Sequence, residues 1–382
     1  MDALNRSPIV DADGHVLEPA DLWTSYIDPK FRDRAIRIDV DDDGLENLMI
    51  DNKSFESLRG MLGSIGGIDL RNKYRAMIPG RLTYEDGCSL GGYDPAERLK
   101  ISDDEEIDIA ILYPTISIFW EGIVTDPKLA TAYTRAYNRW IEEFCSYDRK
   151  RLVPIAHISL LDPEGAVEEV IRCKKAGMAG IYLSPDMPSR AGRFFNDPVY
   201  DRFWETVQEA QMPIALHVVV REDPYYKVWM DPENPVGLFM YAFLAMDVIA
   251  GFTLLLSNGI FDKYPKIRCA VLESGAGWIA YWLDRMDSKY GNGKMVPDDI
   301  ATKPSELFRK HCLVSIDPDE NSTRSVIKDM GAQYFMWASD YPHIDGALGA
   351  VADMKKMLAP LPEADQRMVL GENVMKFYNL TY

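Results

Sequence analysis

The chain of 382 residues is long enough to bury one large core, and its 47% hydrophobic and 27% charged residues are typical of a globular protein. Asp and Glu (60) outnumber Lys and Arg (42), which gives a formal net charge of -18. Nucleic acids and anionic membrane surfaces would repel such a chain, so we expect neither as a partner. The most apolar run, residues 238–256, is interrupted by Asp247 and Gly251 and is interpreted as a buried helix rather than a membrane span.

Two further features bear on the cellular compartment. The first eight residues are polar and lack the basic-then-apolar pattern of a secretion signal. The five cysteines are scattered without paired spacing, as expected in a reducing compartment. We therefore expect a cytoplasmic protein.

The opening segment Ile9-Val10-Asp11-Ala12-Asp13-Gly14-His15 predicts a strand that runs into acidic and imidazole side chains. Because side chains alternate between the two faces of a strand, Asp11, Asp13 and His15 are expected on one face. Two carboxylates and an imidazole on a buried wall are costly unless they are paired or hold a cation. The alternative is an ordinary solvated turn at Asp13-Gly14.

The next segments predict an insertion after this first strand. A short helix is expected within residues 16–27, and residues 34–40 and 47–51 alternate around an Asp-Asp-Asp-Gly turn, which indicates a β-hairpin. Residues 59–95 are rich in glycine and lack clean periodicity. We interpret residues 30–98 as an insertion that covers one end of the fold.

From residue 99 onward, short apolar runs alternate with helical patterns. Strands are predicted at residues 107–113, 152–158, 180–183, 213–217, 267–272, 312–316 and 334–338. Helices are predicted at residues 129–147, 163–176, 198–210, 236–261, 277–289, 322–330 and 347–357. With the opening strand this makes eight strands, which predicts an α/β fold, a distorted (β/α)8 barrel formed by residues 1–382 as a single domain.

Polar side chains fall at several predicted strand ends, where the catalytic groups of such barrels gather. His15 ends the first strand, His217 ends the fifth and Asp340 follows the eighth. With Asp13 they supply two imidazoles and two carboxylates. This set suits Zn²⁺, our first expectation, and also Mn²⁺ or Fe²⁺, with one position left for water or substrate. For any single histidine, the alternative is a hydrogen-bonded core residue.

Glu273 ends the sixth strand and could act as an acid or base, or instead stabilise the N-terminus of the helix that follows. His343 lies just beyond the eighth strand and is a further candidate acid. His157 lies within the third strand and is expected to support the site or belong to the core. His311 precedes the seventh strand, at the wrong end of the barrel.

Substrate-binding residues are less strongly indicated. Arg71, Arg75 and Arg221 could clamp a substrate carboxylate, although solvated surface arginines are the simpler interpretation. Trp120, with Phe119, could line an apolar pocket, as could the aromatic residues in 225–229. Those in 239–243 could line it too, but core or dimer contacts are the preferred interpretation for them.

Four motifs, in this order, resemble the amidohydrolase-related branch of the amidohydrolase superfamily. They are Asp11-Ala-Asp13-Gly-His15, Leu216-His217, Leu272-Glu273-Ser-Gly-Ala-Gly277-Trp278 and Ser339-Asp340-Tyr-Pro-His343. The branch includes aminocarboxymuconate-semialdehyde decarboxylase and the resorcylate and carboxyvanillate decarboxylases. The resemblance extends over nearly the whole chain except residues 35–90, and it implies a distorted (β/α)8 barrel, one divalent metal and a homodimer.

The resemblance also shows where this chain departs from the family pattern. The family's first ligand pair is His-x-His or Glu-x-His, whereas this chain has Asp13-x-His15; His217 and Asp340 match the later ligands. The family's decarboxylases carry a catalytic histidine at the end of the sixth strand, where this chain has Glu273. A glutamate cannot supply the same cationic acid.

Two reactions on a small, possibly aromatic, molecule follow from these residues. The leading expectation is hydrolysis of an amide, ester, lactone or related C–X bond by a metal-activated water. Asp340 would take the proton of the water, and Glu273 or His343 would protonate the leaving group. The alternative is non-oxidative decarboxylation of an aromatic or dienoic acid, in which Asp340 or Glu273 protonates the carbon. An inactive scaffold is disfavoured, because all four candidate ligands are present.

Overall fold

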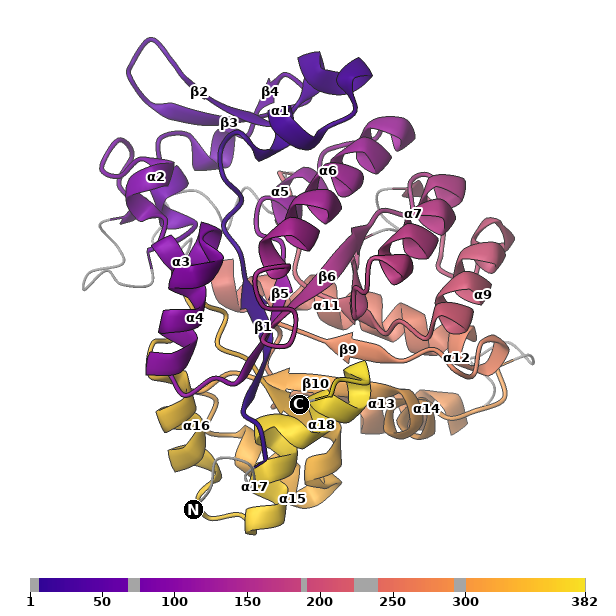
Figure 1. Ribbon diagram of the computed structural model, residues 1–382. Helices are drawn as coiled ribbons and strands as arrows, with labels where there is room; N and C mark the ends of the chain where they lie inside the picture. The colour runs from indigo at the N-terminus through magenta and orange to yellow at the C-terminus, as the bar shows by residue number, and fades with distance from the viewer. Residues whose placement is uncertain (1–6, 68–75, 187–190, 223–239, 292–299, 382) are drawn as a thin grey trace.

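The computed structural model describes residues 7–67, 76–186, 191–222, 240–291 and 300–381. Eight parallel strands lie side by side in chain order (Figure 1). They are β1 (Val10–His15), β5 (Ile109–Tyr113), β6 (Leu152–Ile158), β7 (Gly180–Leu183), β8 (Ile214–Leu216), β9 (Cys269–Val271), β10 (Cys312–Ile316) and β11 (Phe335–Trp337). All eight predicted strands are therefore present, and the predicted (β/α)8 barrel is confirmed.

The ring closes between its first and last strands through the segment that follows β11. The Asp340 amide donates to the Asp13 carbonyl at 3.0 Å, and the His15 amide donates to the Tyr341 carbonyl at 2.7 Å. Every residue of the eight strands is buried, because one face lines the barrel and the other lies under helices. This accounts for the continuous apolar runs that marked the strands in the sequence.

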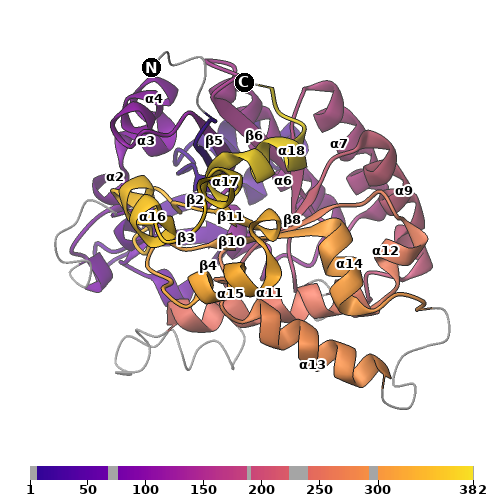
Figure 2. The same cartoon turned by 90° about the horizontal axis from the view of Figure 1, so that it is seen from below.

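Helices surround the strands (Figures 1 and 2). They are α1 (Leu22–Tyr26), α2 (Tyr84–Gly87), α3 (Leu90–Tyr93), α4 (Pro95–Asp104), α5 (Ser117–Trp120), α6 (Pro127–Cys145), α7 (Pro163–Lys175), α9 (Asp201–Ala210), α11 (Met240–Ser257), α12 (Ile260–Lys263), α13 (Ile279–Gly291), α14 (Pro304–His311), α15 (Thr323–Met330), α16 (Ala350–Leu358), α17 (Glu363–Arg367) and α18 (Asn373–Tyr378). The carboxylate of Asp126 caps α6 by accepting from the amides of Lys128 and Leu129. Seven of these helices were not predicted: α2, α3, α4, α5, α14, α17 and α18.

The two ends of the barrel are covered differently. The predicted hairpin is present as a small antiparallel sheet of β2 (Arg37–Val40), β3 (Glu46–Ile50) and β4 (Lys53–Ser54), which lies at the end toward which β1 runs (Figure 1). The C-terminal helices lie at the opposite end (Figure 2), where Asn373 of α18 donates to the carbonyls of Ala332 and Phe335. The carboxyl ends of the strands therefore face the hairpin.

Helix α11 is apolar but is not fully buried. By length and composition it could cross a membrane, a test that core helices of soluble proteins also pass, and 33% of its residues are buried. Leu244, Val248 and Phe252 face the barrel, while Met246 is 52% exposed. The prediction of a helix here is confirmed, but burial is limited to one face.

Candidate metal centre

A β-bulge in β1 decides which of its acidic side chains reach the barrel interior. The pairing of β1 with β5 shifts between Asp11 and Gly14, so the two-residue alternation is interrupted there. Asp13 and His15 face the interior, whereas the Asp11 carboxylate binds Ser339, accepting from its amide at 3.0 Å and its hydroxyl at 2.6 Å. The prediction that all three side chains share one face is wrong for Asp11.

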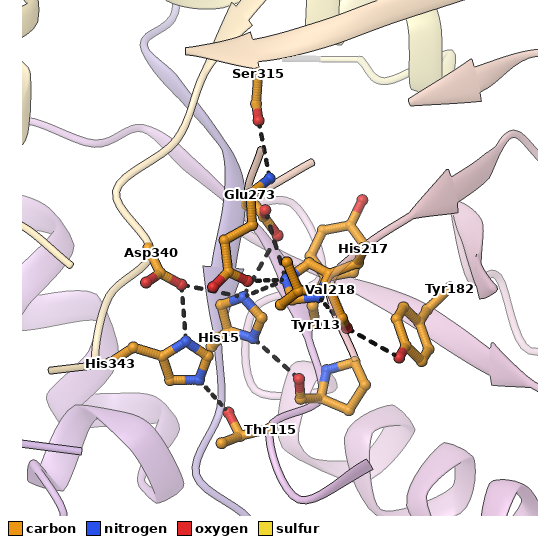
Figure 3. A network of polar contacts seen from close by, with 12 residues as sticks. His15, Tyr113, Thr115, Tyr182, His217, Val218, Glu273, Ser315, Asp340 and His343 are labelled. Atoms are coloured by element: carbon orange, nitrogen blue, oxygen red, sulfur yellow. Dashed lines mark hydrogen bonds and ion pairs between the residues drawn. The ribbon is translucent and has the colours of Figure 1, made fainter. Parts of the chain in front are cut away.

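Five of the side chains expected at the site converge at the carboxyl end of the barrel (Figure 3). The Nε2 atoms of His15 and His217 are 3.1 Å apart. Asp13 lies 3.5 Å from His15 Nε2 and 3.7 Å from His217 Nε2, and an Asp340 oxygen lies 3.3 Å from His15 Nε2. Glu273 Oε2 lies 2.8 Å from His217 Nε2. The ligand atoms form two groups that share His15, each with its atoms within 4.8 Å of one another: Asp13, His15 and His217, and His15, Glu273, Asp340 and His343.

The backbone fixes how the imidazoles of His15 and His217 are oriented. His15 Nδ1 lies 3.0 Å from the Pro114 carbonyl, and His217 Nδ1 lies 3.2 Å from the Val218 carbonyl. A carbonyl only accepts, so each Nδ1 carries the hydrogen and each Nε2 is directed toward the acids. Backbone carbonyls hold metal-binding histidines in this way. Asp13 Oδ1 is buried and accepts no hydrogen bond within the described residues, so this donor set fits a divalent cation.

The electrostatics of the cluster point in the same direction. Burial raises the pKa of Asp13 well above its ordinary value, and it raises the pKa of Asp340 in the same way, with Glu273 and other nearby acids adding to the effect. Burial lowers the pKa of His217, but the charges of Asp13 and Glu273 outweigh it and bring that pKa to about 9. A divalent cation would relieve the repulsion among the carboxylates and compete with the proton on His217.

Two of the carboxylates occupy strained backbone positions. Glu273 and Asp340 have φ angles of 46° and 54°, in the left-handed region that residues other than glycine rarely adopt. Each follows the end of its strand, where the chain turns sharply out of the barrel. Such conformations persist where the surroundings enforce them and are concentrated at functional sites.

Asp340 and His343 share one proton. His343 Nε2 lies 2.7 Å from the Thr115 hydroxyl, which already donates to the Val16 carbonyl, so Nε2 must be the donor to Thr115. His343 Nδ1 lies 2.8 Å from Asp340 Oδ1, and that contact requires a proton on one of the two atoms. Burial lowers the pKa of His343 to about 4 and raises that of Asp340, which in the metal-free protein favours the proton on Asp340 over His343.

Two polar residues of this region were missed in the sequence. Thr115 lies just beyond β5 and orients His343. Asp317 directly follows β10; burial raises its pKa to about 7, with the charges of Glu320 and Glu273 adding to the effect. The rule that singled out His217 and Glu273, a polar residue at the end of an apolar strand, would have found Asp317 as well.

A largely apolar pocket adjoins the cluster. Glu273, His343 and Thr115 lie at its polar side. Its apolar lining includes side chains from the insertion, from α5 and from α11: Leu58, Ile65, Ile118, Phe119, Met240, Tyr241 and Leu244. Met240 and Tyr241 therefore line the pocket, so the preferred interpretation of this segment as core or dimer contacts gives way to its alternative.

The predicted substrate-binding residues are only partly placed in this pocket. Trp120 is fully buried against Tyr133 and His157, so Phe119, one position earlier, faces the pocket in its place. Arg221 lies 3.5 Å from Asp247 and is not among the pocket-lining residues described. Arg71, Arg75 and the aromatic residues of 225–229 lie outside the described residues.

The remaining two histidines lie where the sequence placed them. His157 is fully buried, with Nε2 2.8 Å from Glu121 Oε1, and belongs to the core beneath the site. His311 stacks on Phe261 and contacts the Ile267 carbonyl at 2.9 Å. It ends α14, at the opposite end of the barrel from the cluster.

Comparisons with known proteins give the class of the fold and site. Residues 115–380 match the Amidohydrolase family model. γ-Resorcylate decarboxylase from Polaromonas sp. (strain JS666) is 24% identical over 304 residues, covering 74% of this chain and 86% of that protein. The barrel and its polar strand ends thus belong to an enzyme of the amidohydrolase superfamily.

Solved structures agree with this class. An amidohydrolase from Mycobacterium avium subsp. paratuberculosis K-10 superposes with a TM-score of 0.81 at 21% identity, over 98% of this chain and all of that one. A dihydroxybenzoic acid decarboxylase from Polaromonas sp. JS666, solved with manganese and 2-nitroresorcinol, gives 0.63 at 18% identity over 98% of each chain. The chain belongs to the amidohydrolase family, as the motifs predicted.

Proposed function

We propose that this protein is a metal-dependent carboxy-lyase that removes CO₂ from an aromatic or dienoic carboxylic acid. The observation that carries the proposal is the buried 2.8 Å contact between His343 Nδ1 and Asp340 Oδ1, which requires a proton on one of the two atoms and lies beside the candidate ligands and the apolar pocket. Non-oxidative decarboxylation needs such a proton, because a hydrogen replaces the carboxylate on carbon. Decarboxylases among the relatives support this reaction over hydrolysis, our leading expectation from the sequence.

The ligands in this proposal are Asp13, His15, His217 and Asp340. With two carboxylates, the set is richer in oxygen than one built on a His-x-His pair, which favours Mn²⁺ over Zn²⁺. The manganese in the Polaromonas structure supports the same choice. A divalent ion held by these residues would supply Lewis-acid stabilisation of the negative charge that develops on the substrate.

The residues of the chain then act in sequence. Apolar side chains, among them Ile65 and Phe119, hold the body of the substrate and exclude water from the reacting carbon. Asp340 delivers its proton to the carbon that bears the carboxylate. The carbon–carboxylate bond breaks, its electron pair returns to the conjugated system and CO₂ leaves. After the product leaves, His343, which lines the pocket, takes up a solvent proton at Nδ1 and passes it to Asp340 through their 2.8 Å contact.

Glu273 keeps hydrolysis as a second candidate function. Its carboxylate lies 2.8 Å from His217 Nε2 and reaches the pocket, so it could accept a proton from an attacking water. The two reactions differ in their atoms. Decarboxylation releases CO₂ and takes up one solvent hydrogen on carbon, whereas hydrolysis incorporates one solvent oxygen.

The test uses the Mn²⁺-reconstituted enzyme with hydroxybenzoic and dienoic acids, together with esters and lactones of the same size. In D₂O and H₂¹⁸O we expect CO₂ in equal amount to product, deuterium at the vacated carbon and no ¹⁸O in the organic product. Asp340→Asn should abolish this turnover, while the exposed control Asp329→Asn should retain it. Incorporation of ¹⁸O without CO₂ release would establish hydrolysis instead.

A further inference from the structure

Arg98 of α4 lies buried directly behind the metal-binding end of β1. Its side chain is 2% exposed, and Nη1 donates to the His15 carbonyl at 2.6 Å. Its guanidinium lies over the Tyr341 ring, 4.7 Å from the ring centroid. One side chain thus contacts both β1 and the segment after β11, the two places that carry His15 and Asp340.

Asp11 makes a second link between the same two segments. Its carboxylate accepts from the amide and the hydroxyl of Ser339, the residue before Asp340. The Ser339 hydroxyl in turn accepts from the Tyr341 amide at 3.0 Å. Hydrogen bonds to the buried Asp11 carboxylate therefore hold Ser339 in place, and the Ser339 hydroxyl in turn holds Tyr341, the other neighbour of Asp340.

The two links lie against each other on the outer face of β1. A Cβ atom on Gly14 would come within 2.5 Å of Arg98 Nη2 and within 2.7 Å of an Asp11 oxygen. The guanidinium and the carboxylate therefore lie over the same glycine, and their opposite charges offset the cost of burial. Gly14 is required because any side chain would displace both groups.

We propose that Arg98 is a positioning residue, which with Asp11 sets the separation of His15 and Asp340 and thereby the affinity of the site for its metal. The proposal rests on the metal-ligand set of the proposed function. The location supports it, because the barrel closes here through single backbone hydrogen bonds rather than through a strand ladder. Side-chain links across this seam therefore govern the ligand geometry.

The experiment measures Mn²⁺ dissociation constants of the metal-stripped full chain from the electron paramagnetic resonance signal of free Mn²⁺. The variants are Arg98→Lys and Gly14→Ala. A lysine keeps the charge but cannot both donate to the His15 carbonyl and lay a planar guanidinium over the Tyr341 ring, and the added methyl group displaces the pair without changing a charge. The matched control is Arg151→Lys, since Arg151 likewise donates to backbone carbonyls, those of Ile107 and Asp108, but at the far end of the barrel.

We expect both variants to bind Mn²⁺ about 10- to 100-fold more weakly than the wild type, with the control unchanged. If Arg98→Lys fails to fold, the Mn²⁺ affinity of Gly14→Ala alone tests the positioning role. Wild-type affinity in the variants, or an equal loss in the control, would overturn the positioning role while leaving the metal site intact. Absence of Mn²⁺ binding by the wild type would instead overturn the proposed function, and the positioning role with it.

Discussion

The pH dependence of stability at Asp317 tests whether buried carboxylates lie close together at this end of the barrel. Burial raises its folded-state pKa to about 7 from an ordinary 3.8, with the charges of Glu320, Glu273 and Asp345 adding to the effect. Between these two pH values the native state keeps a proton that the unfolded state has lost. The wild type should therefore lose stability as the pH rises from about 4 to about 7.

The magnitude follows from the shift. A shift of about 3 pH units corresponds to about 4 kcal/mol, of which about 3 kcal/mol falls between pH 5 and pH 8. Asp317→Asn removes this titration. Over that interval, the free energy of unfolding of the wild type should fall by about 3 kcal/mol more than that of the variant.

Urea unfolding of the metal-stripped protein, followed by circular dichroism at pH 5 and pH 8, measures the change in the free energy of unfolding between these pH values for the wild type and for Asp317→Asn. Comparing two pH values cancels any pH-independent cost of the substitution itself. Asp329→Asn, an exposed position on α15, serves as the control and should behave as the wild type. Equal pH dependence in wild type and Asp317→Asn would refute the reasoning.

Three further predictions concern the site and one the assembly. His343→Gln should lower kcat about 100-fold at saturating Mn²⁺ with metal content unchanged, because it interrupts proton return to Asp340; an unaltered kcat would exclude that role. Glu273→Gln should also retain the metal while turnover falls about tenfold, and loss of metal by elemental analysis would make Glu273 a ligand. Ile65→Trp should raise KM about tenfold by filling the pocket; an unchanged KM in steady-state kinetics would contradict this prediction. Light scattering should show that the wild type is a homodimer. Met246→Glu places a charge on the exposed face of α11 and should weaken that dimer; a monomeric wild type would exclude the predicted dimer.

The barrel and most of its polar strand ends could be predicted because one physical rule covers both. Strands buried on two faces read as apolar runs, and parallel strands in a closed ring bring their carboxyl ends together. A polar residue at the end of such a run, such as His217 or Glu273, is then placed without knowledge of tertiary contacts.

The remaining features depend on tertiary packing. The bulge in β1 sends Asp11 outward, and an alternation rule cannot anticipate an extra residue in a strand. Trp120 and Phe119 are adjacent and equally apolar, so only the packing of α5 shows which one faces the pocket. The role of Arg98 depends on a contact with a strand more than 80 residues away, the His15 carbonyl.

The most direct test of the central claim is the metal content of the purified protein after growth with added Mn²⁺, measured by elemental analysis. The wild type should hold about one divalent ion per chain, and His217→Ala should hold a small fraction of that. His311→Ala, which removes a histidine from the opposite end of the barrel, should match the wild type. Full metal content in His217→Ala, or none in the wild type, would contradict the account.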